Sequence, residues 1–199
     1  MEKELPLYEL RIDPKRKSLV NAIALVEDPA IQSDFFYFSN QKELHFKADD
    51  EKQELIGLAM IPDLKIYRRN LETDFEYNVV FTKETIRDTA KTFFQNGFQS
   101  NLNLNHTVTP AGSYIFQSYI VDLEKGINAP KGLQSIDGSW VVGVKVEDKS
   151  VWEQIKAGTV KGFSIEGIFE IFELNENKED GDDEILSMLH QINKLLEKK

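Results

Sequence analysis

Short segments in which apolar residues alternate with polar ones, or form β-branched and aromatic runs, dominate this chain. Such segments predict β-strands, because successive side chains of a strand point to opposite faces. Proline, Asp-Pro and Asp-Gly positions between them predict turns. The expected strands are Leu7–Ile12, Leu19–Val26, Phe35–Ser39, Leu55–Ile61, Phe75–Phe81, Ser113–Leu123, Trp140–Val146 and Lys161–Phe172.

Two segments between the strands repeat their apolar residues at helical spacing. The first follows Thr82, a good N-cap, and ends at Gly97. Its expected inward face is Ile86, Ala90, Phe93 and Phe94. The second begins at Ser150 and ends at Gly158. Its expected inward face is Val151, Trp152 and Ile155. Together with the strands, these helices predict an α+β protein.

The composition changes near the C-terminus. Residues 175–184 are polar and acidic, which is typical of a linker. Apolar residues then return at helical spacing up to the final lysines. We therefore predict a globular domain at residues 1–174, an acidic linker at 175–184 and an amphipathic helix at 185–199. That helix could dock on the domain, pair with a second copy in a homo-oligomer, or bind a scaffold-like partner.

Composition narrows the classes of partner. The chain has 199 residues and 41% hydrophobic content, which is typical of a globular protein. Its net charge of -10 argues against nucleic acid or an anionic membrane as the main partner, because both attract a basic surface. It has no cysteine, which excludes disulfides and thiolate metal sites. No apolar run approaches the roughly 20 residues that span a bilayer. The sequence also lacks zinc-protease, calcium-loop and phosphate-binding motifs, so we expect no metal and no cofactor.

Ser164 lies between two glycines in a strand-like run. The alternation puts Phe163 and Ile165 on an apolar face, with Ser164 and Glu166 on the opposite one. The pattern differs from the G-x-S-x-G nucleophile elbow, because the second glycine, Gly167, comes one residue late and the strand continues. The simpler interpretation is a serine that faces solvent; the alternative is a nucleophile activated by a base.

Three histidines are available as that base. His106 follows a polar run, Asn101–Asn105, and a loop or strand end is where catalytic residues are often held. An ordinary surface histidine would have the same context. His45 is expected at a strand edge or in a loop, and His190 on the polar side of the terminal helix. His106 is therefore the best candidate.

Several blocks of the sequence resemble the XkdF-type serine proteases of tailed phages and prophages, which belong with the prohead (procapsid) maturation proteases. The resemblance covers most of residues 7–173. The block Lys161–Gly167 is the most specific, and the Leu-Val-x-x-Pro-Ala block near the N-terminus is next. The matching blocks are Ser18–Ile31 with Phe35–Ser39, Gly57–Arg68, Asn105-His106, Gly138–Trp140 and Gly158–Gly167.

The resemblance implies a mostly antiparallel β-barrel flanked by helices, similar to herpesvirus assemblin. It implies a serine endopeptidase with Ser164 as nucleophile and His106 as general base. The implied substrates are phage scaffold and major capsid proteins, and the protease itself, cleaved inside the procapsid in the bacterial host cytoplasm. In the broader family an acid precedes the Leu-Val-x-x-Pro-Ala block, but here that position reads Asn21-Ala22. We take Glu166 as the substitute third member; a dyad without one is the alternative.

Two other functions remain open at this point. The chain could be a catalytically inactive structural head-assembly protein with the protease fold, which the missing acid favours. It could also be a barrel that binds a small ligand, which the many aromatic residues favour. Fold alone does not separate these functions.

Overall fold

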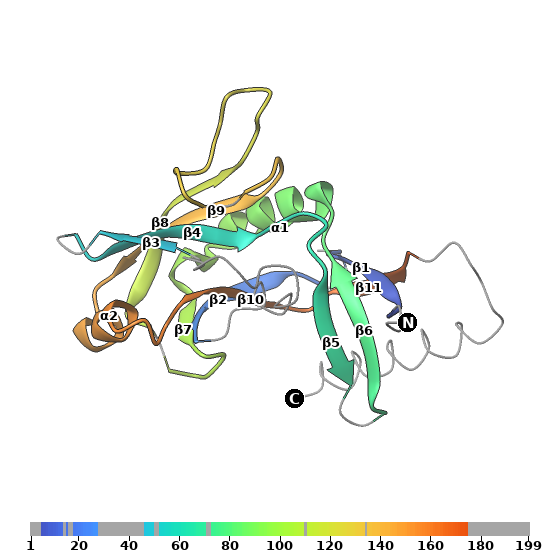
Figure 1. Cartoon of the computed structure of the whole chain (residues 1–199), viewed down its shortest axis with the longest axis horizontal. Coiled ribbons are helices and arrows are strands. Elements are labelled where there is room, and N and C mark those ends of the chain that lie inside the picture. The colour runs from blue at the N-terminus through green and yellow to red at the C-terminus, as the bar shows by residue number, and fades with distance from the viewer. Residues whose placement is uncertain are drawn as a thin grey trace.

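In the part of the chain that the structure describes, strands far apart in the sequence assemble into three sheets, with two α-helices (Figure 1). The computed structural model describes residues 5–13, 15, 18–27, 46–49, 52–70, 73–109, 111–133 and 135–174. The first sheet has the order β11 (Glu170–Glu173), β1 (Leu7–Arg11), β6 (Phe75–Val80), β5 (Ile66–Asn70). The second has the order β10 (Gly162–Gly167), β2 (Val20–Val26), β7 (Leu102–Leu104). The third has the order β3 (Phe46–Asp49), β4 (Glu54–Met60), β9 (Trp140–Val146), β8 (Ser113–Ile120).

The α+β class agrees with the prediction, whereas a single closed barrel does not form in the described part of the chain. Most strand pairs are antiparallel, but β1 pairs with β6 and β2 pairs with β7 in parallel. A barrel closes only when the two outer strands of a sheet pair with each other. Among the described strands, β10 and β7 remain the outer strands of the second sheet, and the other two sheets likewise end in outer strands that pair on one side.

The core lies between the sheets and helix α1 (Lys83–Gln95). Phe93 of α1 is fully buried and meets Trp140 of β9 edge-to-face, with ring centroids 5.6 Å apart. Strand β9 is buried on both faces: Val142 and Val144 join this main core, while Val141 joins a smaller cluster on the other side of the sheet. The third sheet is therefore covered on both sides at its centre.

Both helices form where predicted, with two differences. Thr82 caps α1 by accepting from the Thr85 N–H, but Phe94 is 38% exposed rather than buried. Helix α2 (Lys149–Lys156) is capped by Asp148, not Ser150, because the Asp148 carboxylate accepts from two N–H groups of the first turn. A single turn of 3-10 helix, Phe98–Ser100, follows α1. Among the described residues, none of the helices has the length and apolarity required to cross a bilayer.

The strand predictions held best where apolar alternation was strongest. The predicted strand Lys161–Phe172 is two strands, β10 and β11, separated at Ile168 and Phe169. Strands β3, β5 and β7 were not predicted, because their sequences are short or largely polar. The predicted strand Phe35–Ser39, the linker and the terminal helix lie outside the described residues.

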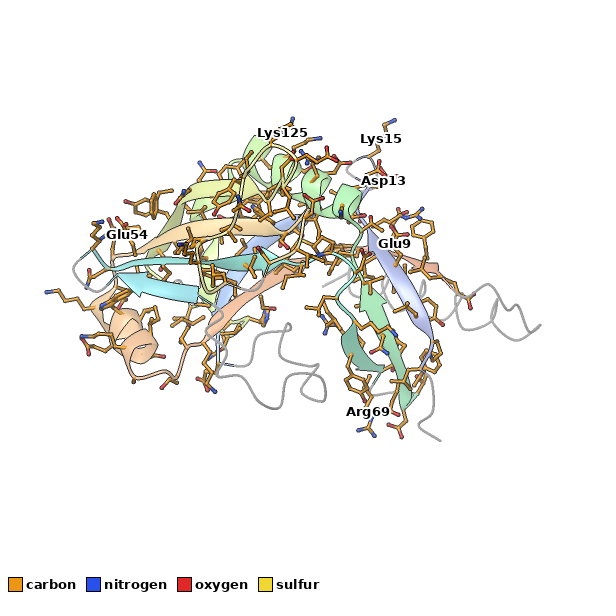
Figure 2. The ribbon with its side chains drawn as sticks, turned by 45° about the horizontal axis from the view of Figure 1, so that its top comes forward. Glu9, Asp13, Lys15, Glu54, Arg69 and Lys125 are labelled. Atoms are coloured by element: carbon orange, nitrogen blue, oxygen red, sulfur yellow. The ribbon has the colours of Figure 1, made fainter. Side chains whose placement is uncertain are left out.

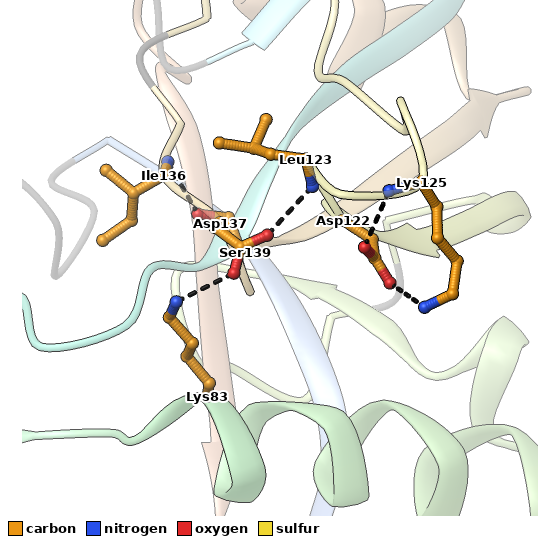
Figure 3. A network of polar contacts seen from close by, with 7 residues as sticks. All are labelled: Lys83, Asp122, Leu123, Lys125, Ile136, Asp137 and Ser139. Carbon is orange, nitrogen blue, oxygen red and sulfur yellow. Dashed lines mark hydrogen bonds and ion pairs between the residues drawn. The ribbon is translucent and has the colours of Figure 1, made fainter.

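A polar network holds the long β8–β9 connection against the start of α1 (Figure 3). Asp137 accepts from the Leu123 N–H at 3.0 Å and from Lys83 Nζ of α1 at 2.8 Å. Within the connection, Asp122 pairs with Lys125, and the Ile136 N–H donates to Ser139 Oγ. These contacts add to a small apolar cluster in which Val121 and Leu133 of the connection pack with Val141.

Phe93 provides a test of the packing. Replacing Phe93 by Ala removes a fully buried ring with three aromatic neighbours, so we expect a loss of about 3–5 kcal/mol in the free energy of unfolding. Phe94→Ala is the matched control, because the neighbouring ring is partly exposed and should cost much less. Urea denaturation followed by circular dichroism measures both. Equal losses for the two variants would contradict this packing.

Candidate active site

The three strands of the second sheet place one side chain each in a common row. Ser164 of β10 pairs with Ala24 of β2, and Ala24 pairs with Asn103 of β7. Residues directly opposite in neighbouring strands project to the same face, so Ser164, Ala24 and Asn103 share a face. Glu166 pairs with Ala22 and lies on the same face. The small alanines leave room above β2 between the polar groups of the outer strands.

Ser164 is buried, with 7% of its surface exposed. The simpler interpretation of a solvent-facing serine is therefore wrong. Other elements of the chain, which the local pattern does not report, cover this face: β4 packs against β10. Ser164 still borders open space, because it lines a cavity of about 760 Å³.

That cavity runs along β10 and has mainly apolar walls. Residues from both faces of β10 line it, which fits the position of β10 as the outer strand of its sheet. The apolar lining includes Ile66, Phe81, Phe163, Ile165, Ile168 and Phe169. Its charged or titratable lining residues are Arg68, His106 and Glu166. Ser164 therefore faces a site of the size and character that binds organic ligands or peptide side chains.

His106 is presented by the turn between β7 and β8. Asn105 and His106 both have positive φ, 49° and 55°, a conformation that Asn tolerates and that other side chains rarely adopt. The turn is held by backbone bonds from Asn105 to Leu25 of β2 and from Thr107 to Leu104. The Asn105 side chain also exchanges two hydrogen bonds with Glu27. These contacts tie His106 to the end of β2, and thus to the strand that pairs with β10.

The structure brings His106 and Glu166 into contact. His106 Nδ1 lies 3.0 Å from Glu166 Oε1. An ionised carboxylate only accepts, so the tautomer that fits this contact has its proton on Nδ1 and leaves Nε2 free to accept. The His106 side chain is 45% exposed and that of Glu166 30% exposed, so the pair lies at the mouth of the cavity rather than in its interior. A carboxylate that orients a histidine in this way is a recurring arrangement in hydrolases.

Asn103 is a site residue that the sequence analysis missed. Its Nδ2 donates to Glu166 Oε1 at 2.6 Å, so Asn103 and His106 hold the same carboxylate oxygen. Its Oδ1 is buried and has no hydrogen-bond partner among the described residues. Asn103 lies in a polar run that predicts a loop, and only the parallel pairing of β7 with β2 turns it toward Ser164. In the sequence, the only indication of a role for Asn103 was that it stands three residues before His106.

The end of β10 is fixed by close contact with the chain that leads into β2. A Cβ atom at Gly167 would lie 2.5 Å from the Leu19 carbonyl oxygen and 2.7 Å from Val20 Cα. Ser18 Oγ donates to the Ile168 carbonyl at 2.9 Å, and the Ile168 N–H donates to the Leu19 carbonyl. Glycine is therefore required at position 167 for close approach. These contacts set the position of Glu166 immediately before it.

The predicted site residues are thus near one another, although not all in contact. Ser164 and His106 line the same cavity, and no hydrogen bond joins them in the described structure. Catalytic hydrogen bonds are often long in a free enzyme and tighten when substrate binds. His45 and His190 lie outside the described residues. Within the described ranges, His, Cys, Asp and Glu side chains form no group of three or more that could hold a metal ion.

The His106–Glu166 contact predicts one imidazole tautomer. At alkaline pH, where an imidazole is neutral, nitrogen-15 correlation spectra should show the His106 proton on Nδ1, because Glu166 accepts it. In Glu166→Ala the acceptor is gone, and the proton should redistribute between the two ring nitrogens. Glu124→Ala removes an exposed glutamate elsewhere and is the control, while His106→Gln assigns the signal. A tautomer that is unchanged in Glu166→Ala would contradict the contact.

Comparisons with known proteins now give the family. The chain is 26% identical over 167 residues to "Phage-like element PBSX protein XkdF" of Bacillus subtilis (strain 168), which covers 79% of this chain and 55% of that protein. It is 27% identical over 172 residues to "Uncharacterized protein YqbD" of the same organism, covering 80% of this chain and 49% of that protein. The chain therefore spans about half the length of these relatives. No solved structure matches it. Residues 41–173 match the family described as "Putative phage serine protease XkdF", and the chain belongs to that family.

Proposed function

We propose that this protein is a prohead maturation serine protease that cleaves scaffold or capsid protein, and itself, during phage head assembly. Ser164 is the nucleophile, His106 the general base, and Glu166 the residue that orients the base. The observation that carries the proposal is the His106 Nδ1 contact with Glu166 at the cavity that Ser164 also lines. The family description, which names a phage serine protease, agrees with it.

The first step in this proposal is acyl transfer. His106 Nε2 takes the hydroxyl proton of Ser164 while Oγ attacks the carbonyl carbon of the scissile peptide. The tetrahedral intermediate collapses when its C–N bond breaks, and the imidazolium gives its proton to the leaving amine. Glu166 accepts from Nδ1–H and stabilises the positive charge on the ring between these steps. For this, the Ser164 hydroxyl and His106 Nε2 must approach each other as the substrate fills the cavity.

Water then completes the reaction. A water molecule enters after the amine leaves, His106 removes its proton, and the resulting hydroxide attacks the acyl carbon. Breakage of the ester bond returns the proton to Ser164 Oγ. Asn103 acts as a positioning residue in this scheme, because its donation to Glu166 Oε1 limits the rotation of the carboxylate that holds His106.

The proposed setting is the interior of the procapsid in the infected bacterium. Enzyme and protein substrate would be confined together there, so the effective concentration is high and rapid diffusional capture is unnecessary. The predicted helix at residues 185–199 would serve as the tether to scaffold, or as a contact with a second copy.

An activity-based label tests the proposal. Intact mass after fluorophosphonate treatment should show one adduct on the folded wild type, because only an activated serine reacts at an appreciable rate. Ser164→Ala should show none, and His106→Ala should react at least about 100-fold more slowly, since it lacks the base. Chemically denatured wild type is the control for non-specific reaction. Circular dichroism verifies that each variant is folded.

The rival function predicts a different result. An inactive structural head-assembly protein would show no adduct on wild type, or an adduct that persists in Ser164→Ala. The absence of a direct hydrogen bond between Ser164 and His106 is the observation that favours this rival. Labelling that depends on both residues would exclude it.

A further inference from the structure

Arg68 of β5 lines the same cavity as Ser164. Strand alternation explains its direction: Ile66 and Arg68 lie on one face of β5, and both line the cavity. Tyr67 and Arg69 lie on the opposite face. A cation is thus placed against walls that are otherwise largely apolar.

The two faces of β5 differ in how their polar side chains are paired. On the outer face Tyr67 Oη donates to Glu76 at 2.5 Å, and Arg69 Nε donates to Asp74 at 2.6 Å. Figure 2 shows Arg69 near the free end of the β5–β6 hairpin. Arg68 donates one bond, from Nη1 to the Tyr67 carbonyl at 3.1 Å, and no carboxylate of the described residues pairs with it. Its guanidinium has five N–H donors, so most remain available.

The surroundings of Arg68 are those of a cavity wall. Burial lowers the pKa of Arg68, whereas the Asp74 carboxylate raises the pKa of Arg69. By area the Arg68 side chain is nevertheless exposed. Both observations hold for a side chain that is surrounded by protein yet open to the water inside a cavity. An arginine keeps its charge under such burial, and the described part of the chain places no carboxylate against it.

The cavity has one carboxylate among its described lining residues, and it is already engaged. Glu166 Oε1 takes hydrogen bonds from both Asn103 and His106, and no ion pair joins Glu166 to Arg68. None of the described lining residues supplies the anion, and a ligand can supply it. A single guanidinium with apolar neighbours matches a carboxylate with its hydrocarbon stem, whereas a phosphate dianion usually gathers several cations.

We propose that Arg68 binds an acidic side chain, Glu or Asp, of a protein segment seated in the cavity, and so selects the substrate. The apolar walls around it take up the adjacent apolar side chains of that segment. The inference rests on the proposed function, because it takes a polypeptide substrate as the occupant, and it adds the specificity of the site. With a net charge of -10 on the chain, long-range attraction does not favour an acidic segment, so recognition depends on this local pair.

A peptide array tests the pair without requiring cleavage. The protein is the full chain with Ser164→Ala, and the probes are short peptides of Ala, Val, Leu and Phe in which one position is Glu, Gln or Lys. Peptides with Glu should bind about 10- to 100-fold more tightly than those with Gln, the effect of one hydrogen-bonded charge pair. Adding Arg68→Gln should abolish the difference, and Arg68→Glu should favour Lys. Arg69→Gln, which changes the neighbouring arginine, should keep the preference for Glu.

Three results would overturn the inference: equal binding of Glu and Gln peptides, a Glu preference that survives Arg68→Gln, or no peptide binding at all. Circular dichroism must show that the Arg68 variants are folded. The peptide array and the fluorophosphonate label test the two proposals separately. If the protein is not a serine protease, the wild type will not be labelled, whatever the array shows. A protein that binds acidic peptides but is not labelled would keep the binding site and lose the catalytic proposal.

Discussion

The pairing of β10 with β2 is the constraint on which the candidate site depends. It joins residues about 140 positions apart and places Ser164 opposite Ala24, while β2 also pairs with β7 and so brings Asn103 into the same row. The loop that presents His106 is attached to the end of β2 through Asn105. Ser164, His106 and the groups that hold His106 therefore depend on one strand, and a shift of one residue in its register would turn the polar groups into the core.

Small residues make this arrangement possible. Ala22 and Ala24 of β2 lie between the polar side chains of β10 and β7, and a larger side chain at either position would occupy the space in which Glu166 meets Asn103. Gly167 permits the chain before β2 to approach the end of β10 at a distance that no Cβ allows. The apolar residues of the same strands point to the opposite face and pack in the core. One face of the sheet therefore stabilises the fold, and the other carries the polar groups of the candidate site.

The sequence was informative wherever a local pattern decided the structure. The bounds of β9 follow from its apolar run, and those of α1 from the Thr82 cap and helical spacing. Motifs and the family resemblance selected Ser164, His106 and Glu166, which the structure places around one cavity; their catalytic roles stay a prediction. It was uninformative where distant segments decide. The polar run that contains Asn103 becomes a strand only by pairing with β2, and Ser164 is buried only because other elements cover its face. Likewise, the three sheets of the described strands do not close into the expected barrel.

The backbone at His106 is held by contacts on both sides. Two consecutive residues with positive φ, Asn105 and His106, store strain that isolated turns of this composition would release. The structure offsets it with the bonds of Asn105 to Leu25 and Glu27 on one side, and with the ring contact to Glu166 on the other. The turn is thus fixed at both ends while the imidazole itself stays half exposed. Under the proposed mechanism, the approach of Nε2 to Ser164 would therefore have to come from rotation of the half-exposed side chain, because the backbone that carries it is fixed.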